Sequence, residues 1–148
     1  MPYTIKDKSE LTGLPASTLR YYDKQGLLPN LKRDGNNIRI FTDDDYASLR
    51  LIDCLKRSGL SIKDIKKFID MAGKEGALPA RLEIFRKRRE ILRKELEDLK
   101  GVLDVIDYKC WYYEKACEAG SDSAVKNLKS SDIPEEFRKA HETLHKKP

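Results

Sequence analysis

The second half of the chain carries a long stripe of apolar side chains, which constrains the fold more than any other feature. Residues 80–118 contain no proline and a single glycine, so one helix of roughly 55 to 60 Å is predicted. Apolar residues recur along it at alternating spacings of three and four, as in a heptad repeat. The stripe comprises Leu82, Phe85, Arg89, Leu92, Leu96, Leu99, Leu103, Ile106, Cys110, Tyr113 and Cys117, with Arg89 its one charged member.

Such a stripe needs a partner helix, because a lone helix in a chain of 148 residues cannot bury it. A homodimer through this helix is the economical solution. The central dimerisation contacts are expected from Leu92, Leu96, Leu99, Leu103 and Ile106.

Residues 3–29 are predicted to form two short helices separated by a turn. Thr4 and Asp7 have the spacing of a capping box, and Gly13 is a natural stop for the first helix. Pro15 suits the first turn of the second helix. Two short helices joined by a glycine turn indicate a helix-turn-helix.

Residues 31–41 change from helical periodicity to a turn followed by β-forming residues. Asp34 and Gly35 predict a hairpin, and Asn36 and Asn37 tolerate left-handed backbone, so this segment is interpreted as a small wing. Two further helices, capped by Thr42 and Ser61, complete the module. The expected organisation is a winged helix-turn-helix over residues 1–76, a dimerisation helix over 77–118, and a tail over 119–148 with a short helix after Pro134.

The net charge of +5 favours acidic partners, and over half of it lies in residues 1–39, with seven basic and four acidic side chains. Ser17, Thr18 and Arg20 lie near the start of the second helix, where hydroxyls and a guanidinium suit phosphates and base edges. Cations in the wing are placed to meet the flanking backbone. They are Lys32, Arg33 and Arg39.

Several ordered segments together resemble the MerR-type transcription regulators, over about residues 3–118. They are Tyr3-Thr4-Ile5, Leu11-Thr12-Gly13-Leu14, Thr18-Leu19-Arg20-Tyr21-Tyr22-Asp23, Gly26-Leu27-Leu28-Pro29, Ile38-Arg39-Ile40-Phe41 and Gly59-Leu60-Ser61-Ile62-Lys63-Asp64-Ile65. Three departures are Pro15 in place of a serine cap, Lys8 where an apolar residue is common, and Asn37-Ile38 in place of Gly-Tyr.

The resemblance implies a mainly α fold, in which a winged helix-turn-helix precedes a long antiparallel coiled-coil dimerisation helix. It also implies a homodimer that binds double-stranded promoter DNA with an overlong spacer, and bends and untwists it for RNA polymerase. By motif position, Ser17, Thr18 and Arg20 would enter the major groove. Tyr21, Tyr22, Arg33, Arg39 and Lys56 would contact the DNA backbone. The basic run Arg86 to Arg89 matches no motif and is interpreted as a solvated helix face.

The cysteines bear on the effector. Metal-sensing members of the resembled family place a thiol at the start of the dimerisation helix or in a loop after it, and this chain has neither, so no metal or cofactor is expected. Cys54 and the following Gly59 segment resemble the aldehyde- and thiol-responsive, NmlR/AdhR-like branch. That resemblance implies a small electrophile sensed at Cys54. The alternative is a buried Cys54 that continues the apolar stripe of Ala47 and Leu51.

A second effector hypothesis concerns Cys110, Trp111 and Tyr112, which could line a pocket for an aromatic or cationic drug-like ligand, although such rings are more often packing. His141 and His145 are interpreted as solvated residues of the tail helix.

Composition excludes several other classes. No apolar run is long enough for a membrane span and the start does not resemble a secretion signal, so a cytoplasmic protein is expected. Three cysteines without a CxxC pair do not form a disulfide framework. No catalytic triad, phosphate loop or metal triad can be assembled, so no enzyme is predicted. From another class, a helical scaffold that does not bind DNA is the remaining alternative.

Overall fold

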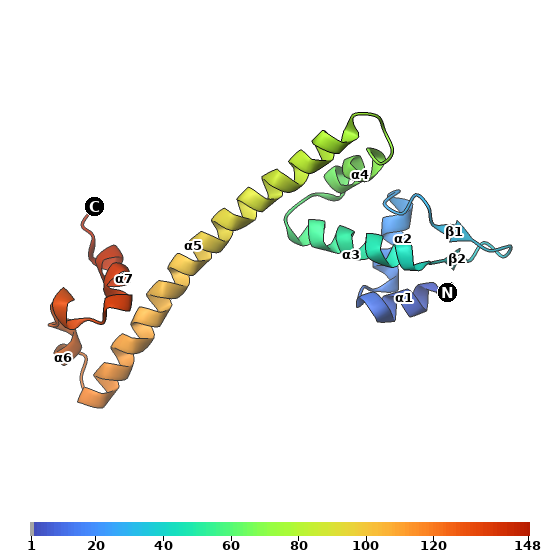
Figure 1. Cartoon of the computed structure of the whole chain (residues 1–148). Coiled ribbons are helices and arrows are strands. Elements are labelled where there is room, and N and C mark those ends of the chain that lie inside the picture. The colour runs from blue at the N-terminus through green and yellow to red at the C-terminus, as the bar shows by residue number, and fades with distance from the viewer. Residues whose placement is uncertain (1) are drawn as a thin grey trace. The chain divides into compact units, whose positions relative to one another are not determined.

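The computed structural model describes residues 2–148, whose contacts form two compact units (Figure 1). The first unit ends at Arg89 and the second begins at Glu90, so both include part of the long helix α5, Ala77–Ala119. The first unit also holds α1 (Ile5–Thr12), α2 (Ala16–Lys24), β1 (Lys32–Arg33), β2 (Arg39–Ile40), α3 (Asp43–Arg57) and α4 (Ile62–Asp70). The second unit adds α6 (Ser123–Lys126), a 3₁₀ turn η1 (Ser130–Asp132) and α7 (Glu135–His145).

Local capping signals set where the helices of the first unit begin. The Thr4 amide donates to Asp7 Oδ2 at 2.8 Å, and the Asp7 amide donates to Thr4 Oγ1 at 3.3 Å, which confirms the predicted capping box. The hydrogen bond from the Thr4 hydroxyl lowers the pKa of Asp7. Thr42 and Asp45 form the same box at the start of α3, and Ser61 caps α4. Gly13 ends α1 at φ 70°, a conformation that favours glycine.

A short antiparallel hairpin forms the wing. Lys32 pairs with Ile40 and Arg33 with Arg39. The turn is closed by Asp34, whose Oδ1 accepts from the Asn36 amide at 2.9 Å and the Ile38 amide at 2.8 Å. Asn37 has φ 62°, in line with the expectation that it tolerates left-handed backbone. The hairpin, helix-turn-helix and long helix confirm the predicted fold class.

One apolar core holds the first unit together. Its buried members come from α2, the segment before the wing, the strand end, and helices α3 and α4: Leu19, Tyr22, Leu27, Leu28, Phe41, Leu49, Ile52, Leu55, Ile65 and Phe68. Lys8 is 1% exposed, and its ammonium lies 4.0 Å from the ring centroid of Tyr3 and 4.8 Å from that of Tyr46. Two aromatic faces therefore accommodate a cation at the position where the resembled family commonly has an apolar residue.

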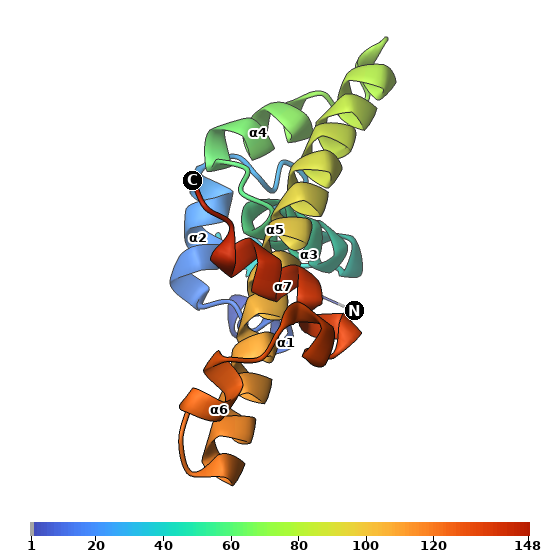
Figure 2. The same cartoon turned by 90° about the vertical axis from the view of Figure 1, so that its left-hand side faces the viewer.

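The second unit folds the tail against the end of α5 (Figure 2). Tyr108, Ile133 and Ala140 are buried, and Trp111 and Phe137 pack against them. This packing uses one face of α5 and leaves the predicted dimerisation stripe uncovered: Leu96 is 67% exposed and Leu99 66%. No helix among residues 2–148 is long and apolar enough to cross a membrane.

Candidate nucleic-acid interface

Helix α2 has a buried face and an exposed face, and the predicted DNA-contacting residues divide between them. Leu19 is fully buried, whereas Ser17 and Arg20 are exposed and Thr18 is half-buried. Tyr21 is 44% exposed, with its ring centroid 6.2 Å from that of Tyr22. The exposed face therefore presents a hydroxyl, a guanidinium and a phenol, which suit phosphates and base edges.

Tyr22 is a core residue, which corrects its assignment to the DNA-backbone contacts. Its side chain is 3% exposed, because it lies three residues after Leu19 on the inward face of α2. Burial raises the pKa of its phenol. In the Arg-Tyr-Tyr motif, Tyr21 is therefore the exposed ring and Tyr22 is the packing ring. The motif alone does not distinguish the two; the burial of Leu19, three residues before Tyr22, does.

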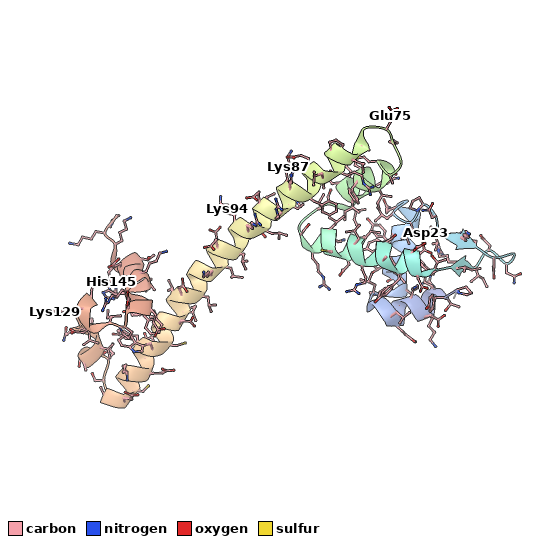
Figure 3. All side chains as sticks on the ribbon, viewed as in Figure 1. Asp23, Glu75, Lys87, Lys94, Lys129 and His145 are labelled. Atoms are coloured by element: carbon pink, nitrogen blue, oxygen red, sulfur yellow. The ribbon has the colours of Figure 1, made fainter. Side chains whose placement is uncertain are left out.

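The wing is attached to α2 through one carboxylate. Asp23 Oδ2 lies 2.9 Å from Arg33 Nη2 and 2.7 Å from Arg39 Nε, while Arg33 Nη1 donates to the Asn37 carbonyl at 3.2 Å. Figure 3 marks Asp23 close to the hairpin. Two guanidinium groups share one carboxylate, so a positive charge remains there. Charge-assisted bonds of this kind hold the wing and α2 in one geometry.

Lys56 lies on the last turn of α3 and is exposed. Its neighbour Arg57 forms an ion pair with Asp53, with Nε 3.1 Å from Oδ2, and is largely solvated. The exposed position leaves Lys56 accessible to a phosphate, and its assignment to the DNA backbone stays a prediction.

Cys54 is exposed, so the alternative of a buried cysteine is wrong. It lies on α3 at the edge of a surface pocket of about 480 Å³. The pocket is lined by Leu11, Thr12, Leu14, Tyr46, Leu49, Arg50, Asp53, Cys54 and Arg57. Asp53, which precedes Cys54, forms an ion pair with Arg57 at the rim of this pocket.

Arg88 makes a structural contact that the sequence analysis did not predict. Its Nη1 atom donates to the Ser58 carbonyl at 3.1 Å, so it joins α5 to the end of α3. The run Arg86 to Arg89 was expected to be a solvated face, which is wrong for Arg88. A cation suits the carbonyl end of a helix. The two residues lie 30 positions apart, however, and no local signal links them.

The aromatic residues near Cys110 pack against the tail. The ring centroids of Trp111 and Phe137 are 5.8 Å apart, and those of Tyr108 and Tyr112 are 6.4 Å apart. Cys110 itself is exposed. The rings of Trp111 and Tyr112 therefore contribute to a packed cluster.

His141 is part of this packing, which corrects its interpretation as a solvated residue. The Tyr108 hydroxyl and His141 Nδ1 are 2.9 Å apart, and His145 Nδ1 donates to the His141 carbonyl at 2.8 Å. Burial lowers the pKa of His141 and raises that of Tyr108. The fold therefore favours neutral His141, whose Nδ1 shares a hydrogen bond with the phenol.

The three cysteines are free and exposed, and no cluster of three or more metal-ligating side chains occurs among residues 2–148. The structure offers residues for DNA contact and a thiol beside a pocket, without a composite metal site in the described part of the chain.

Comparisons with known proteins agree with this geometry. The signature of the MerR HTH family regulatory proteins matches residues 3–72, and a second signature, described as MerR, DNA binding, matches residues 46–108. The chain is similar to an HTH-type transcriptional regulator of Haemophilus influenzae, with 42% identity over 137 residues that cover 91% of this chain and 98% of that protein.

Two further similarities bear on the branch of the family. The regulator AdhR of Bacillus subtilis is 39% identical over 56 residues, which cover 38% of this chain and 40% of AdhR. Among solved structures, HiNmlR, a MerR family regulator lacking the sensor domain and bound to promoter DNA, superposes with a TM-score of 0.74. It is 41% identical, over 84% of this chain and 99% of HiNmlR.

Proposed function

The chain belongs to the MerR family of helix-turn-helix transcription regulators, and from this premise we propose that it acts as a homodimer on double-stranded promoter DNA in the cytoplasm. The observation that carries the proposal is the joint presentation of Arg20 and Tyr21 on α2 and of two arginines on a wing bonded to α2 through Asp23. HiNmlR, which is similar over most of its length, is bound to promoter DNA. These facts favour a DNA-binding regulator over the helical scaffold.

The exposed stripe of α5 supports the homodimer. Leu92, Leu96, Leu99, Leu103 and Ile106 are all exposed in the single chain. A row of leucines at heptad spacing is costly to leave in water, and a second copy in an antiparallel coil would bury it. The dimer would then carry two recognition helices, one for each half-site of a palindromic operator.

We propose that this dimer distorts an overlong promoter spacer. Half-sites out of reach on straight DNA can be engaged by both recognition helices if the duplex bends and untwists, at a cost of several kcal/mol. Contacts at both half-sites would offset that cost. A change in the angle between α3 and α5 would alter the distortion, and so the alignment of the promoter for RNA polymerase.

We propose that the effector is a reactive aldehyde or another small electrophile, with Cys54 as the sensing thiol. In the aldehyde case the sulfur forms a bond to the carbonyl carbon, the carbonyl π bond breaks, and the oxygen takes up the thiol proton. The pocket beside Cys54 has room for the adduct. The Ser58 amide donates to the Cys54 carbonyl at 3.0 Å, and the Ser58 carbonyl accepts from Arg88. We propose that these two hydrogen bonds transmit a displacement of α3, caused by the adduct, to α5.

The test is promoter-reporter transcription with formaldehyde or methylglyoxal, comparing wild type, Cys54→Ser and Cys117→Ser at matched protein levels. Cys117 is an exposed thiol outside the pocket and controls for general thiol damage. Loss of induction in Cys54→Ser alone, with DNA binding retained, supports the sensing role. Induction unchanged in Cys54→Ser contradicts it.

A second candidate function is recognition of a cationic apolar ligand by the second unit. A pocket of about 500 Å³ lies between α5 and α7, with apolar walls from Val102, Val105 and Ile106. Asp98, Asp104 and Glu136 also line it, together with one lysine, Lys139, so the lining has an excess of negative charge that favours a cation. This pocket is not the one predicted at Cys110, Trp111 and Tyr112, because none of these three residues lines it. The rings of Trp111 and Tyr112 pack in the cluster with the tail instead. Isothermal titration with a lipophilic cation, in wild type and in Glu136→Gln, tests it.

A further inference from the structure

The charges that flank Cys54 on α3 are mainly positive. Arg50 lies four residues before Cys54 and Arg57 three residues after it, so both lie about one turn away on the same side of the helix. All three residues line the pocket of about 480 Å³ described above. Within the described chain, Asp53 is the single acid of that lining, and it pairs with Arg57. Two arginines against one aspartate leave the pocket with an excess of positive charge.

Cys110 on α5 has the opposite surroundings. Asp107 lies three residues before it and Glu114 four residues after it, at the same helical spacings. The adjacent Lys109 lies over an aromatic ring, with its ammonium 4.8 Å from the ring centroid of Tyr112. Cys110 is exposed, as Cys54 is. The balance of charge around Cys110 is therefore negative, so the chain contains two exposed thiols that differ in the sign of their neighbours.

Arg50 lies at the wall of the pocket with its donors accessible. Its guanidinium carbon is 5.8 Å from the ring centroid of Tyr46, which also lines the pocket. The ammonium of the buried Lys8 lies 4.8 Å from the same centroid, so a second cation stands close to this wall. Arg50 itself is exposed and can meet a ligand that enters the pocket. The planar donors of a guanidinium match the two oxygen atoms of a carboxylate.

Apolar side chains form another part of the pocket. Leu11, Leu14 and Leu49 line it, and they come from the end of α1, the turn after it, and α3. Their surfaces suit the carbon atoms of a small organic molecule. The pocket therefore combines an exposed thiol, an accessible guanidinium on the same side of α3, and an apolar wall.

We propose that the electrophile sensed at Cys54 carries a carboxylate, which Arg50 binds while the thiol attacks. Glyoxylate, an aldehyde bonded directly to a carboxylate, is the simplest aldehyde of this class. The proposal rests on the proposed sensing role of Cys54 and narrows its effectors to anionic ones. The sulfur bonds to the aldehyde carbon, the carbonyl π bond breaks, and the oxygen takes up the thiol proton. The carboxylate is unchanged and stays paired with Arg50.

The first measurement compares two alkylating reagents of nearly equal size, the anion iodoacetate and the neutral iodoacetamide. With each reagent the sulfur bonds to the methylene carbon, iodide leaves with the electron pair of the carbon–iodine bond, and the thiol proton passes to the buffer. The exposure of the thiol and its thiolate fraction affect both rates alike, so the ratio of the two rates reports the surrounding charge. Mass spectrometry of the digested full chain gives this ratio for each cysteine.

The ratio of the iodoacetate rate to the iodoacetamide rate is expected to be at least about threefold higher at Cys54 than at Cys110 in the folded chain. At Cys54 it should also be at least about twofold higher in the folded chain than after unfolding in urea, which is uncharged. The difference should shrink as the salt concentration rises from about 0.05 M to about 0.5 M, because salt screens exposed charges.

The decisive variant is Arg50→Gln, which is expected to lower the Cys54 ratio at least about twofold. Arg50→Lys keeps the charge and is expected to retain most of the ratio. Lys63→Gln removes one positive charge elsewhere in the same unit and is the matched control, since Lys63 is exposed and does not line the pocket. Arg50 is exposed and lies outside the apolar core, so these substitutions leave the packing of the core intact.

The second measurement uses glyoxylate and methylglyoxal, which has a methyl ketone in place of the carboxylate. Each aldehyde is titrated for its protection of Cys54 against iodoacetamide. Because the two aldehydes differ in intrinsic reactivity, each is compared between wild type and Arg50→Gln. The substitution is expected to raise the half-protecting concentration of glyoxylate at least about threefold and to leave that of methylglyoxal unchanged.

The outcomes separate this proposal from the sensing role on which it rests. The carboxylate proposal is overturned if the Cys54 ratio is equal in the folded and unfolded chain, if Arg50→Gln and Lys63→Gln lower it equally, or if Arg50→Gln does not weaken protection by glyoxylate. Each of these results leaves Cys54 as a reactive thiol. Absence of any reaction of Cys54 with both alkylating reagents in the folded chain overturns the sensing role and the carboxylate proposal together.

Discussion

The Nε atom of Arg39 lies 2.7 Å from Oδ2 of Asp23, so the second strand of the wing is bonded to the last turn of α2. Both side chains are mostly shielded from water, with 24% and 18% of their surface exposed. Shielding makes such a pair stronger than an exposed ion pair of the same length. The wing and α2 are therefore held together as one body.

The substitution Asp23→Asn distinguishes two effects on DNA affinity: the orientation of the wing arginines and the net charge of the surface. Removal of an acid from a DNA-binding face would by itself raise affinity for phosphate. We expect the opposite, a loss of roughly tenfold, because Arg33 and Arg39 lose the shared carboxylate that orients them. Fluorescence anisotropy with operator DNA at several salt concentrations measures this. Higher affinity in the variant would show that the contact does not organise the interface.

Arg20→Ala is expected to abolish specific operator binding and to leave the dimer intact. A major-groove arginine contributes about 1 to 3 kcal/mol of discrimination between bases. Gel-shift titration with operator and scrambled duplexes measures the ratio of the two affinities. Lys24→Ala, on the same helix, controls for loss of charge alone. A ratio that stays at the wild-type value in Arg20→Ala would remove it from the base contacts.

Polar substitution of Leu96 and Leu99 is expected to dissociate the dimer. Burial of each leucine in the dimer contributes about 1.5 to 3 kcal/mol. The double variant Leu96→Gln, Leu99→Gln therefore loses two of the five central contacts of each chain. Light scattering gives the mass directly. Lys94→Gln is the control, since Lys94 projects from α5 (Figure 3). An unchanged mass in the double variant would place the interface elsewhere.

Arg88→Met is expected to uncouple the effector response from DNA binding. The substitution removes the bond from α5 to the Ser58 carbonyl, with a stability cost of about 1 to 3 kcal/mol. Reporter induction should fall while operator affinity stays near wild type. Lys87→Met, at a neighbouring position that projects from the helix (Figure 3), is the control. Full induction in Arg88→Met would show that the bond carries no signal.

The tail is expected to loosen as the pH falls through the range of histidine titration. Burial lowers the pKa of His141 below its ordinary value, and so the neutral form is the one that the fold favours. Its contribution is complete above the ordinary histidine pKa of about 6.5 and is lost as the pH falls toward the lower value in the folded chain.

Fluorescence of Trp111, the single tryptophan, reports this change because its ring packs against Phe137. His141→Gln should remove the pH dependence, and His145→Gln should retain most of it. A spectrum that is constant between pH 7.5 and 5 would contradict the role of the Tyr108 to His141 bond.

Local chemistry made much of the fold predictable. The pairs Thr4 with Asp7 and Thr42 with Asp45 act over three residues, so their spacing alone locates two helix starts. The apolar stripe of α5 can likewise be predicted from the spacing of residues in the sequence alone. The family resemblance identified the exposed face of α2, although the burial of Tyr22 had to come from the structure.

The rest depends on contacts between residues that are distant in the chain. Arg88 meets Ser58 across 30 positions, and Tyr108 meets His141 across 33. The spacing of neither pair in the sequence predicts a contact, because the packing of α5 against other elements brings the two residues together.

The exposed leucines of α5 also bear on how much protein a cell must make. If the operator is occupied by the dimer alone, then below the dissociation constant of the dimer the concentration of active species rises with the square of the chain concentration. Doubling expression in that range quadruples the active form. Dimerisation through the stripe of α5 would thus convert a modest change in synthesis or degradation into a sharper change in promoter occupancy, before any effector binds.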